Sequence, residues 1–267
     1  MKLCQLNINI NQFVLTLLLV LGLVVMSGCQ QQEVEQEKEI LIYCGITMIK
    51  PMTEIAGIIE QKYDCKVLIT KGGSGNLLKS IKANKIGDLY LPGSGSYIQA
   101  CLEQGLVTDT VHVGFNKAAM MVQKGNPKNI PGNLDSMADK SYYVVIGNPE
   151  SGSIGRETEK ILTKKGIFTQ VADNVQMMTT DSKDLVRVLK DKEADLVINW
   201  YATSTWSENS ESLSVLPISD KYAGKKKLII GLLRFSRYPD ISKAFMEYAS
   251  SAEGKAIFNK YGLYDVK

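Results

Sequence analysis

The segment between residues 39 and 105 repeats one order three times: a short apolar run, a turn containing glycine with serine or threonine, and an amphipathic stretch. The apolar runs, residues 39–44, 65–70 and 88–91, are predicted strands, and the stretches after them carry apolar residues at helical spacing. Strands that alternate with helices predict a parallel sheet with helices on its faces. The alternative is an α+β fold in which these turns are unrelated.

The rest of the body continues this alternation. Its predicted strands are residues 142–146, 175–178, 196–201 and 228–233, and its predicted helices are residues 184–190, 241–250 and 253–261, with one more ending near Gly166. The fold class is therefore α/β, and the length suits two lobes, each a mostly parallel sheet flanked by helices. We expect the chain to leave the first lobe near residues 118–123 and to return near residues 227–232. The expected lobes are residues 39–120 with 229–267, and residues 121–228.

The first 38 residues predict a targeting segment and a tether. Lys2 precedes an uncharged apolar run, residues 13–26, which is too short to span a bilayer of about 30 Å as a helix. Ser27-Gly28-Cys29 follows, and small residues before a cysteine resemble the site at which bacterial lipoproteins are cleaved and acylated. We expect a signal peptide over residues 1–28, lipid on Cys29 and a flexible tether over residues 29–38. A short membrane anchor and plain cleavage after Gly28 are the alternatives.

Charge and reactive side chains exclude several classes of function. Lys and Arg number 31 against 28 Asp and Glu, a net charge of +3, which is too weak to indicate nucleic acid as a partner. His112 is the only histidine, so a multi-histidine metal site is excluded, and we expect neither a metal nor a cofactor. Once Cys4 leaves with the signal peptide and Cys29 takes the lipid, an odd number of cysteines remains, which predicts no disulfide framework. The remaining cysteines are Cys44, Cys65 and Cys101.

Hydroxyl side chains stand where predicted helices begin, just beyond the ends of predicted strands. Unpaired backbone N–H groups and the helix dipole favour an anion at such places. The candidate hydroxyls are Thr47, Ser74, Ser94, Ser96, Ser151 and Ser153. The alternative is that these residues only cap their helices. The chain contains no P-loop, dinucleotide fingerprint, nucleophile elbow or paired-cysteine motif, so we expect a binding protein and no enzyme.

Several local sequences are similar to those of one family of binding proteins. The matching segments are Cys44-Gly45-Ile46-Thr47, Gly73-Ser74-Gly75, Asn148-Pro149 with Gly155-Arg156, and Tyr201-Ala202-Thr203. With the C-terminal pattern from Ala244 to Gly262, they make residues 39–267 resemble the molybdate/tungstate-binding proteins of bacterial ABC transporters. That family has the two-lobed type II periplasmic binding-protein fold. The resemblance implies a lipid-anchored, extracytoplasmic solute-binding protein that delivers its ligand to an ABC permease, and we expect a monomer.

The resemblance also implies a ligand site between the lobes. The ligand-binding residues that it implies are Thr47, Gly73, Ser74, Ser151, Ser153 and Tyr201, the last as a phenol donor. Four departures from the family pattern lie near this site. Cys44-Gly45-Ile46 replaces a run of alanines, and Thr47 replaces a serine. Asn199-Trp200 adds a residue before the tyrosine, and Ser204 stands where an aspartate usually follows.

The expected ligand is a small tetrahedral oxyanion. Neutral hydroxyls and helix N-termini suit a fully deprotonated dianion, whose oxygens only accept hydrogen bonds. A protonated phosphate would need an acceptor, and Ser204 removes the acid that the family pattern would supply. We therefore expect molybdate or tungstate to bind more tightly than phosphate. The alternatives are sulfate, phosphate, a small phosphorylated or carboxylated metabolite, a sensory lipoprotein of the same fold, and a secreted enzyme, which would need a general base in the cleft.

Overall fold

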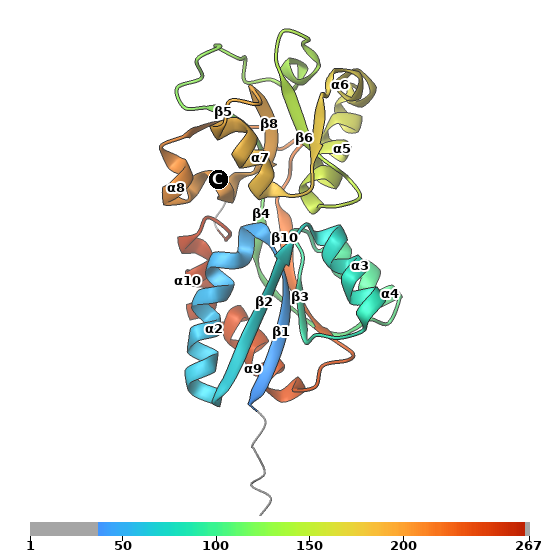
Figure 1. Cartoon of the computed structure of the whole chain (residues 1–267), viewed down its shortest axis with the longest axis vertical. Helices are drawn as coiled ribbons and strands as arrows, with labels where there is room; N and C mark the ends of the chain where they lie inside the picture. The colour runs from blue at the N-terminus through green and yellow to red at the C-terminus, as the bar shows by residue number, and fades with distance from the viewer. Residues whose placement is uncertain (1–36, 265–267) are drawn as a thin grey trace, which may run out of the picture. The chain divides into compact units, whose positions relative to one another are not determined.

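The computed structural model of the chain describes residues 37–264. Two five-stranded sheets, each flanked by helices, make up this region (Figure 1). The predicted α/β fold with two lobes is therefore confirmed, and we use "first lobe" and "second lobe" for the two sheets with the helices that pack on them. The predicted signal peptide, Cys29 and all but the last two residues of the predicted tether lie outside the described residues.

The first sheet contains the three strands predicted at the start of the body. Its order is β2-β1-β3-β10-β4, in which β1, β2 and β3 are parallel and β10 is antiparallel to both of its neighbours. The strands are β1 (Lys38–Gly45), β2 (Cys65–Gly72), β3 (Leu89–Leu91), β4 (Val107–Asn116) and β10 (Lys226–Leu233). Because β1, β2 and β3 are parallel, their C-terminal ends meet at one edge of the sheet.

Helices cover both faces of this sheet (Figure 1). On one face α2, α9 and α10 form a hydrophobic cluster that includes Met52, Ile55, Phe245 and Phe258. On the other face α3 and α4 contribute a second cluster around Leu77. The helices are α2 (Ile49–Tyr63), α3 (Ser74–Asn84), α4 (Ser96–Glu103), α9 (Pro239–Ser250) and α10 (Ala252–Lys260). The predicted alternation of strand and helix thus places three helix starts at the edge where the parallel strands end.

The second sheet has the order β7-β6-β8-β5-β9. Strand β6 is parallel to β7 and β8, and β5 is antiparallel to β8 and β9. The strands are β5 (Ala118–Gln123), β6 (Val144–Gly147), β7 (Met177–Thr179), β8 (Leu196–Trp200) and β9 (Leu213–Leu216). The α-helices are α5 (Ser153–Lys165), α6 (Phe168–Asn174), α7 (Ser182–Lys190) and α8 (Ser207–Ser210). A third hydrophobic cluster, built on β5, β6 and β8, forms the core of this lobe.

The chain passes between the sheets twice. The first passage lies between Asn116 and Ala118, and the second lies between Leu216 and Lys226. An ion pair of 2.8 Å between Lys117 and Asp220 joins the two passages. The lobe boundaries expected from the sequence stay a prediction, although β5 as a whole belongs to the second sheet and β10 as a whole to the first.

Thr47 does not cap a helix. It lies within a short 3₁₀ turn, η1 (Ile46–Met48), and α2 begins after this turn without a side-chain cap. The apolar face predicted for α2 is confirmed, because Met52, Ile55 and Ile59 are buried. The inserted turn leaves the Thr47 hydroxyl free of the helix, so the local capping explanation for this residue is wrong.

The cysteines of the body are free thiols. Cys44, Cys65 and Cys101 are all buried, and no disulfide joins them. Cys44 and Cys65 lie toward opposite ends of two paired parallel strands, since Cys65 pairs with Lys38 and Cys44 pairs with Lys71. The prediction that these cysteines serve as small buried apolar groups is therefore confirmed for the part of the chain that the structure covers.

Candidate anion-binding site

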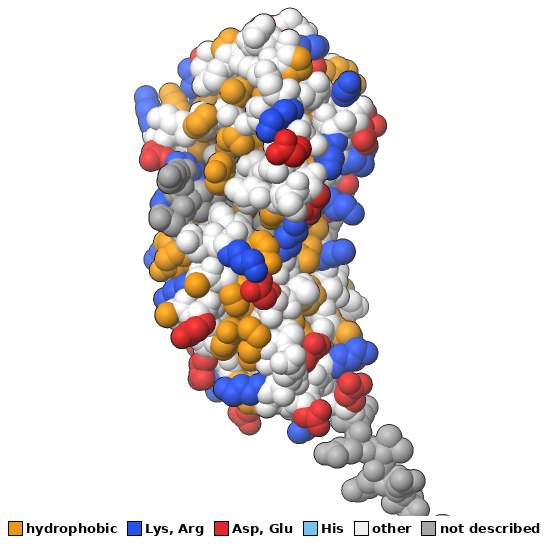
Figure 2. Space-filling model, turned by 90° about the vertical axis from the view of Figure 1, so that its left-hand side faces the viewer, with side chains coloured by type: hydrophobic (Ala, Val, Ile, Leu, Met, Phe, Trp, Pro, Cys, Tyr) orange, Lys and Arg blue, Asp and Glu red, His pale blue; other side chains and the backbone are white. Residues whose placement is uncertain are grey.

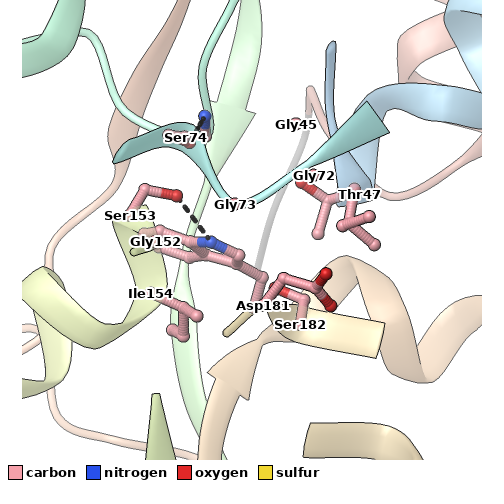
Figure 3. A pocket seen from close by; sticks show the side chains of 13 residues that line it. Gly45, Thr47, Gly72, Gly73, Ser74, Gly152, Ser153, Ile154, Asp181 and Ser182 are labelled. Atoms are coloured by element: carbon pink, nitrogen blue, oxygen red, sulfur yellow. Dashed lines mark hydrogen bonds between the residues drawn. The ribbon is translucent and has the colours of Figure 1, made fainter. Parts of the chain in front are cut away.

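The C-terminal ends of the parallel strands in both sheets border one small cavity, which we call the central cavity (Figure 3). Its volume is about 10 Å³, counted as the space open to the centre of a water-sized sphere. The lining residues are Gly45, Ile46, Thr47, Gly72, Gly73, Ser74 and Gly93 from the first lobe and Gly152, Ser153, Ile154, Asp181, Ser182 and Trp200 from the second. Ligands of open α/β sheets bind at this edge, so the position is that of a binding site.

The Ser74 hydroxyl is held as a donor toward the central cavity. Ser74 is the first residue of α3, and its Oγ accepts a hydrogen bond of 3.0 Å from the backbone N–H of Gly93. The hydroxyl of Tyr90 donates to the Ser74 carbonyl at 2.7 Å and fixes the backbone there. A hydroxyl whose oxygen already accepts a bond keeps its hydrogen for another partner. Ser74 can therefore donate to a ligand.

Ser153 has the same arrangement on the opposite lobe. It is the first residue of α5, and the indole Nε1–H of Trp200 donates to its Oγ at 3.3 Å (Figure 3). Trp200 is the last residue of β8 and is fully buried, so the indole is a fixed donor. The Ser153 hydrogen is thus also free to point at a ligand.

Thr47 is a third hydroxyl residue that lines the central cavity, beside Ser74 and Ser153. Its Oγ1 accepts a hydrogen bond of 3.2 Å from Asn116 Nδ2, and the same amide group donates to the Gly93 carbonyl at 3.1 Å. The Thr47 hydroxyl lies 2.7 Å from Met48 Sδ, a weak acceptor that an anion would replace. Three hydroxyls from both lobes therefore each accept one hydrogen bond. Those of Ser74 and Ser153 donate to no described residue, and that of Thr47 donates only to Met48 Sδ.

Helix N-termini add backbone donors. Neither α3 nor α5 has a side-chain cap. In α3 the Asn76 N–H donates to the Ser151 carbonyl, which leaves the N–H groups of Ser74 and Gly75, and in α5 those of Ser153, Ile154 and Gly155, for a ligand. Helix α7 differs, because the Asp181 carboxylate accepts hydrogen bonds from the N–H groups of Lys183, at 2.8 Å, and Asp184, at 3.3 Å. No lysine or arginine lines the central cavity. The cavity therefore presents hydroxyl and backbone N–H groups without a full positive charge, an arrangement that can hold an anion.

Asp181 corrects an expectation from the sequence. An acid was expected to be missing from the cleft because Ser204 replaces the family's aspartate, but the Asp181 carboxylate lines the central cavity. Burial raises the pKa of Asp181 above its ordinary value, against the opposing effect of its hydrogen bonds from the N–H groups of Lys183 and Asp184. Thr180-Asp181-Ser182 after a predicted strand is a recognisable helix-capping sequence, and this signal could have placed an acid at the cavity.

Two of the six expected ligand residues, Ser151 and Tyr201, do not line the central cavity. Ser151 Oγ donates to the carbonyls of Asn148, at 3.2 Å, and Thr180, at 3.0 Å, and the Ser151 carbonyl accepts from the N–H of Asn76 at 3.1 Å. Ser151 therefore joins the lobes beside the cavity. Thr47, Gly73, Ser74 and Ser153 do line it. Their role as ligand contacts stays a proposal.

Trp200 stands where the tyrosine was expected. Strand β8 runs one residue further than the family pattern, so Trp200 is the strand residue that faces the cavity, and Tyr201 begins the 3₁₀ turn η3 (Tyr201–Thr205). The Tyr201 N–H donates to the Lys117 carbonyl at 2.8 Å, and its phenol is not among the lining groups. At the end of β8 the cavity is therefore lined by an indole that donates to Ser153.

A larger groove of about 380 Å³ adjoins the central cavity at Ile46. Its basic residues are Lys50, Lys71, Lys183, Arg187 and Lys190, and its acidic residues are Asp191 and Glu208. Lys50 of the first lobe pairs with Glu208 of the second at 2.7 Å. Basic residues thus outnumber acidic ones in this groove beside the central cavity, and a positive potential there favours the approach of anions.

The surface beside α2, α8 and α10 carries mixed charge. Figure 2 shows this side, where basic and acidic side chains alternate with hydrophobic ones. Among residues 37–264 no group of three or more His, Cys, Asp or Glu side chains could hold a metal ion. No helix in this range is long and apolar enough to cross a membrane.

Comparisons with known proteins agree with this architecture. The profile of a family described as bacterial extracellular solute-binding protein matches residues 40–264. A Haemophilus influenzae protein named "Putative binding protein" is 25% identical over 232 residues, which are 87% of this chain and 93% of the relative. A Bacillus subtilis protein named "Putative ABC transporter substrate-binding lipoprotein YvgL" is 21% identical over 246 residues, 88% of this chain and 92% of the relative.

Two solved structures show the same fold. The sulfate-binding protein SubI from Mycobacterium tuberculosis H37Rv has a TM-score of 0.76 at 14% identity, covering 86% of this chain and 88% of that one. The periplasmic molybdate-binding protein of Azotobacter vinelandii has a TM-score of 0.73 at 13% identity, covering 85% of this chain and 100% of that one. Because the family profile spans nearly the whole described region, the chain belongs to the bacterial extracellular solute-binding proteins.

Proposed function

We propose that the protein is the solute-binding component of an ABC importer and that it captures one small tetrahedral oxyanion in the central cavity. The observation that carries this proposal is the arrangement of Thr47, Ser74 and Ser153. Each hydroxyl accepts a hydrogen bond from a neighbouring donor, and each lines the same cavity. Three such donors and two uncapped helix N-termini converge on a space that no cationic side chain enters.

The size of the central cavity supports a compact ligand. A single water needs roughly 10–15 Å³ by the same measure, and the cavity offers about 10 Å³. A tetrahedral oxyanion has five heavy atoms and is larger than one water, so we propose that the lobes separate slightly to admit it. A sugar or a peptide would require a wider separation.

The proposed identity of the anion rests on the family resemblance and on one residue of the cavity wall. Molybdate and tungstate are the candidates that the family resemblance provides, and a molybdate-binding protein of the same fold supports them. Sulfate is an alternative, since a sulfate-binding protein shares the fold. Hydrogen phosphate is a second candidate that one specific observation favours, the Asp181 carboxylate in the cavity wall. No catalytic step belongs to the proposal.

The proposed location is the bacterial cell envelope, with lipid on Cys29 and a permease as partner. Ser27-Gly28-Cys29 supports the anchor, and the Bacillus subtilis relative is named a lipoprotein of an ABC transporter. Mass spectrometry of the N-terminal peptide should find a diacylglyceryl group on Cys29. Cleavage at another position, or an unmodified thiol on Cys29, would contradict the anchor without affecting the binding site.

Calorimetry on the purified protein tests the binding site. A charge-assisted hydrogen bond contributes about 1.5–3 kcal/mol, so Ser74→Ala should weaken oxyanion binding by roughly ten- to a hundredfold. Ser96→Ala is the matched control, because Ser96 also begins a helix but is exposed and lies outside the cavity lining. Equal affinities in all three proteins, or no oxyanion binding by the wild type, would contradict the proposal.

A further inference from the structure

Asp181 is the only charged group in the wall of the central cavity. Its carboxylate accepts hydrogen bonds from the N–H groups of Lys183 and Asp184 through one oxygen, Oδ1. The other oxygen, Oδ2, accepts no hydrogen bond from any residue in the described part of the chain. Figure 3 shows Asp181 and Ser182 on the wall that the start of α7 contributes. Asp181, with one carboxylate oxygen that has no hydrogen-bond partner among the described residues, thus lines a cavity whose other polar side chains can donate.

We propose that Asp181 makes the central cavity select an oxyanion that carries a hydrogen of its own, such as hydrogen phosphate, over the fully deprotonated molybdate, tungstate and sulfate ions. The proposal rests on the proposed function and narrows its ligand class. It also reverses the ranking expected from the sequence, which assumed that the cleft contains no acid.

The reason is a count of donors and acceptors. Thr47, Ser74 and Ser153 offer three hydroxyl hydrogens, and the uncapped starts of α3 and α5 offer backbone N–H groups. These donors suit the unprotonated oxygens of any tetrahedral oxyanion. Asp181 is the complementary acceptor for one O–H group on the ligand. A ligand without this hydrogen would place its own anionic oxygen against the carboxylate, and like charges in contact disfavour that ligand.

Capping does not require an aspartate at this position. Asn and Ser cap helices about as well as Asp, and neither brings a negative charge to an anion site. Burial raises the pKa of Asp181 and the charge of Asp184 adds to this effect, whereas the hydrogen bonds from the N–H groups of Lys183 and Asp184 and the charge of Lys183 oppose it. The carboxylate is therefore a better proton acceptor than an exposed aspartate, which strengthens its bond to a ligand hydrogen.

Calorimetry with phosphate and sulfate at slightly alkaline pH tests this inference most cleanly. Under that condition hydrogen phosphate and sulfate have the same charge and nearly the same shape, and they differ by one hydrogen. Wild-type protein should bind phosphate at least about tenfold more tightly than sulfate, the difference that 1.4 kcal/mol produces. Molybdate, tested in parallel, should follow sulfate.

Asp181→Asn removes the charge and keeps the helix cap. Its side-chain amide supplies a donor to the ligand, so the variant should bind sulfate and molybdate more tightly than wild type and phosphate at least about tenfold more weakly. Asp184→Asn is the matched control, because Asp184 lies on the same helix, accepts from Thr180 Oγ1 at 3.0 Å and does not line the cavity. It should keep the wild-type ranking. Asp181→Ser, which also caps a helix, serves as a second variant, and circular dichroism reports the folding of all three.

The outcomes separate the inference from the function on which it rests. Wild-type protein that prefers sulfate or molybdate to phosphate would overturn the inference and leave the oxyanion-binding proposal intact. An unchanged ranking in folded Asp181→Asn and Asp181→Ser would overturn it as well, since Asp181 would then act as a cap or donate a proton of its own. Wild-type protein that binds none of the three anions would overturn the proposed function itself.

Discussion

A hydroxyl group helps to bind an anion only when its hydrogen is directed at the ligand. In the central cavity this direction comes from residues behind the hydroxyls: the Gly93 N–H for Ser74, Asn116 for Thr47 and Trp200 for Ser153. Each supporting donor is buried, so water does not compete for it. The supporting residues therefore determine the donor pattern as much as the hydroxyls do.

Trp200 offers a direct test of this arrangement. Trp200→Phe keeps an aromatic ring at the end of β8 and removes the Nε1–H that donates to Ser153. Loss of one hydrogen bond of about 1 kcal/mol should weaken oxyanion binding roughly fivefold. Calorimetry measures the effect. Trp206→Phe is the control, because the Trp206 indole N–H has no hydrogen-bond partner in the described structure and its removal should leave the affinity unchanged. Equal losses in both variants would refute the orienting role of Trp200.

The sequence predicts the cavity residues unevenly. Gly73, Ser74 and Ser153 could be expected there because small and hydroxyl residues stand directly after predicted strands, and parallel strands end at one edge. The resemblance implies Tyr201, whereas the structure has Trp200 in the cavity lining, since the residue that faces the cavity depends on where β8 stops. Asp181 was missed because its role depends on the position of α7 across the cavity, which no local pattern contains.

At the scale of elements, the start of α3 packs directly against the second lobe. The Asn76 N–H donates to the Ser151 carbonyl at 3.1 Å, and a Cβ atom on Gly73 would lie 2.6 Å from the Thr180 carbonyl oxygen. A Cβ atom on Gly75 would overlap the Glu150 carbonyl. Glycine is needed at these positions for the close approach of two backbones. The close contact around the cavity therefore depends on the absence of two side chains.

Gly75→Ala should prevent this contact without unfolding the protein. Alanine favours a helix over glycine by up to about 1 kcal/mol, so α3 itself gains stability, whereas the second lobe can no longer reach its place. We expect oxyanion affinity to fall at least about tenfold, with an unchanged or slightly higher melting temperature. Gly57→Ala in α2 is the control, since no atom lies within 4 Å of its added Cβ. Wild-type affinity in Gly75→Ala would show that the close approach is not required for binding.

Element prediction succeeds where apolar runs are continuous. Strands β1, β2, β3, β8 and β10 were predicted because each contains such a run between turn residues. Strand β4 was not predicted, because it lies at the edge of its sheet and its exposed positions are polar or charged. Strand β5 was predicted only as a crossing segment, and β9 was not predicted, because it is a short edge strand in which Ser214 interrupts the apolar run. Edge position and short length weaken the periodic signal in these cases.

At the scale of the molecule, the two lobes are tied on both sides of the central cavity. On one side Lys50 of α2 pairs with Glu208 of α8 at 2.7 Å. On the other, the guanidinium of Arg156 in α5 lies 4.1 Å from the ring centre of Tyr97 in α4. The ion pair is partly exposed, and exposed pairs contribute about 0.2–1 kcal/mol, so this tie is weak. Under the proposed function, ties this weak would allow the lobes to open, and a bound anion would add the contacts that close them.

Anomalous diffraction tests most directly whether the central cavity is the anion site. Crystals grown with arsenate, which carries a hydrogen as phosphate does, and separate crystals grown with tungstate would each locate their heavy atom. We predict one strong peak within hydrogen-bonding reach of the hydroxyls of Thr47, Ser74 and Ser153, with an arsenate oxygen against Asp181. A peak in the basic groove beside Lys71 and Lys183, with none in the central cavity, would contradict the proposed site.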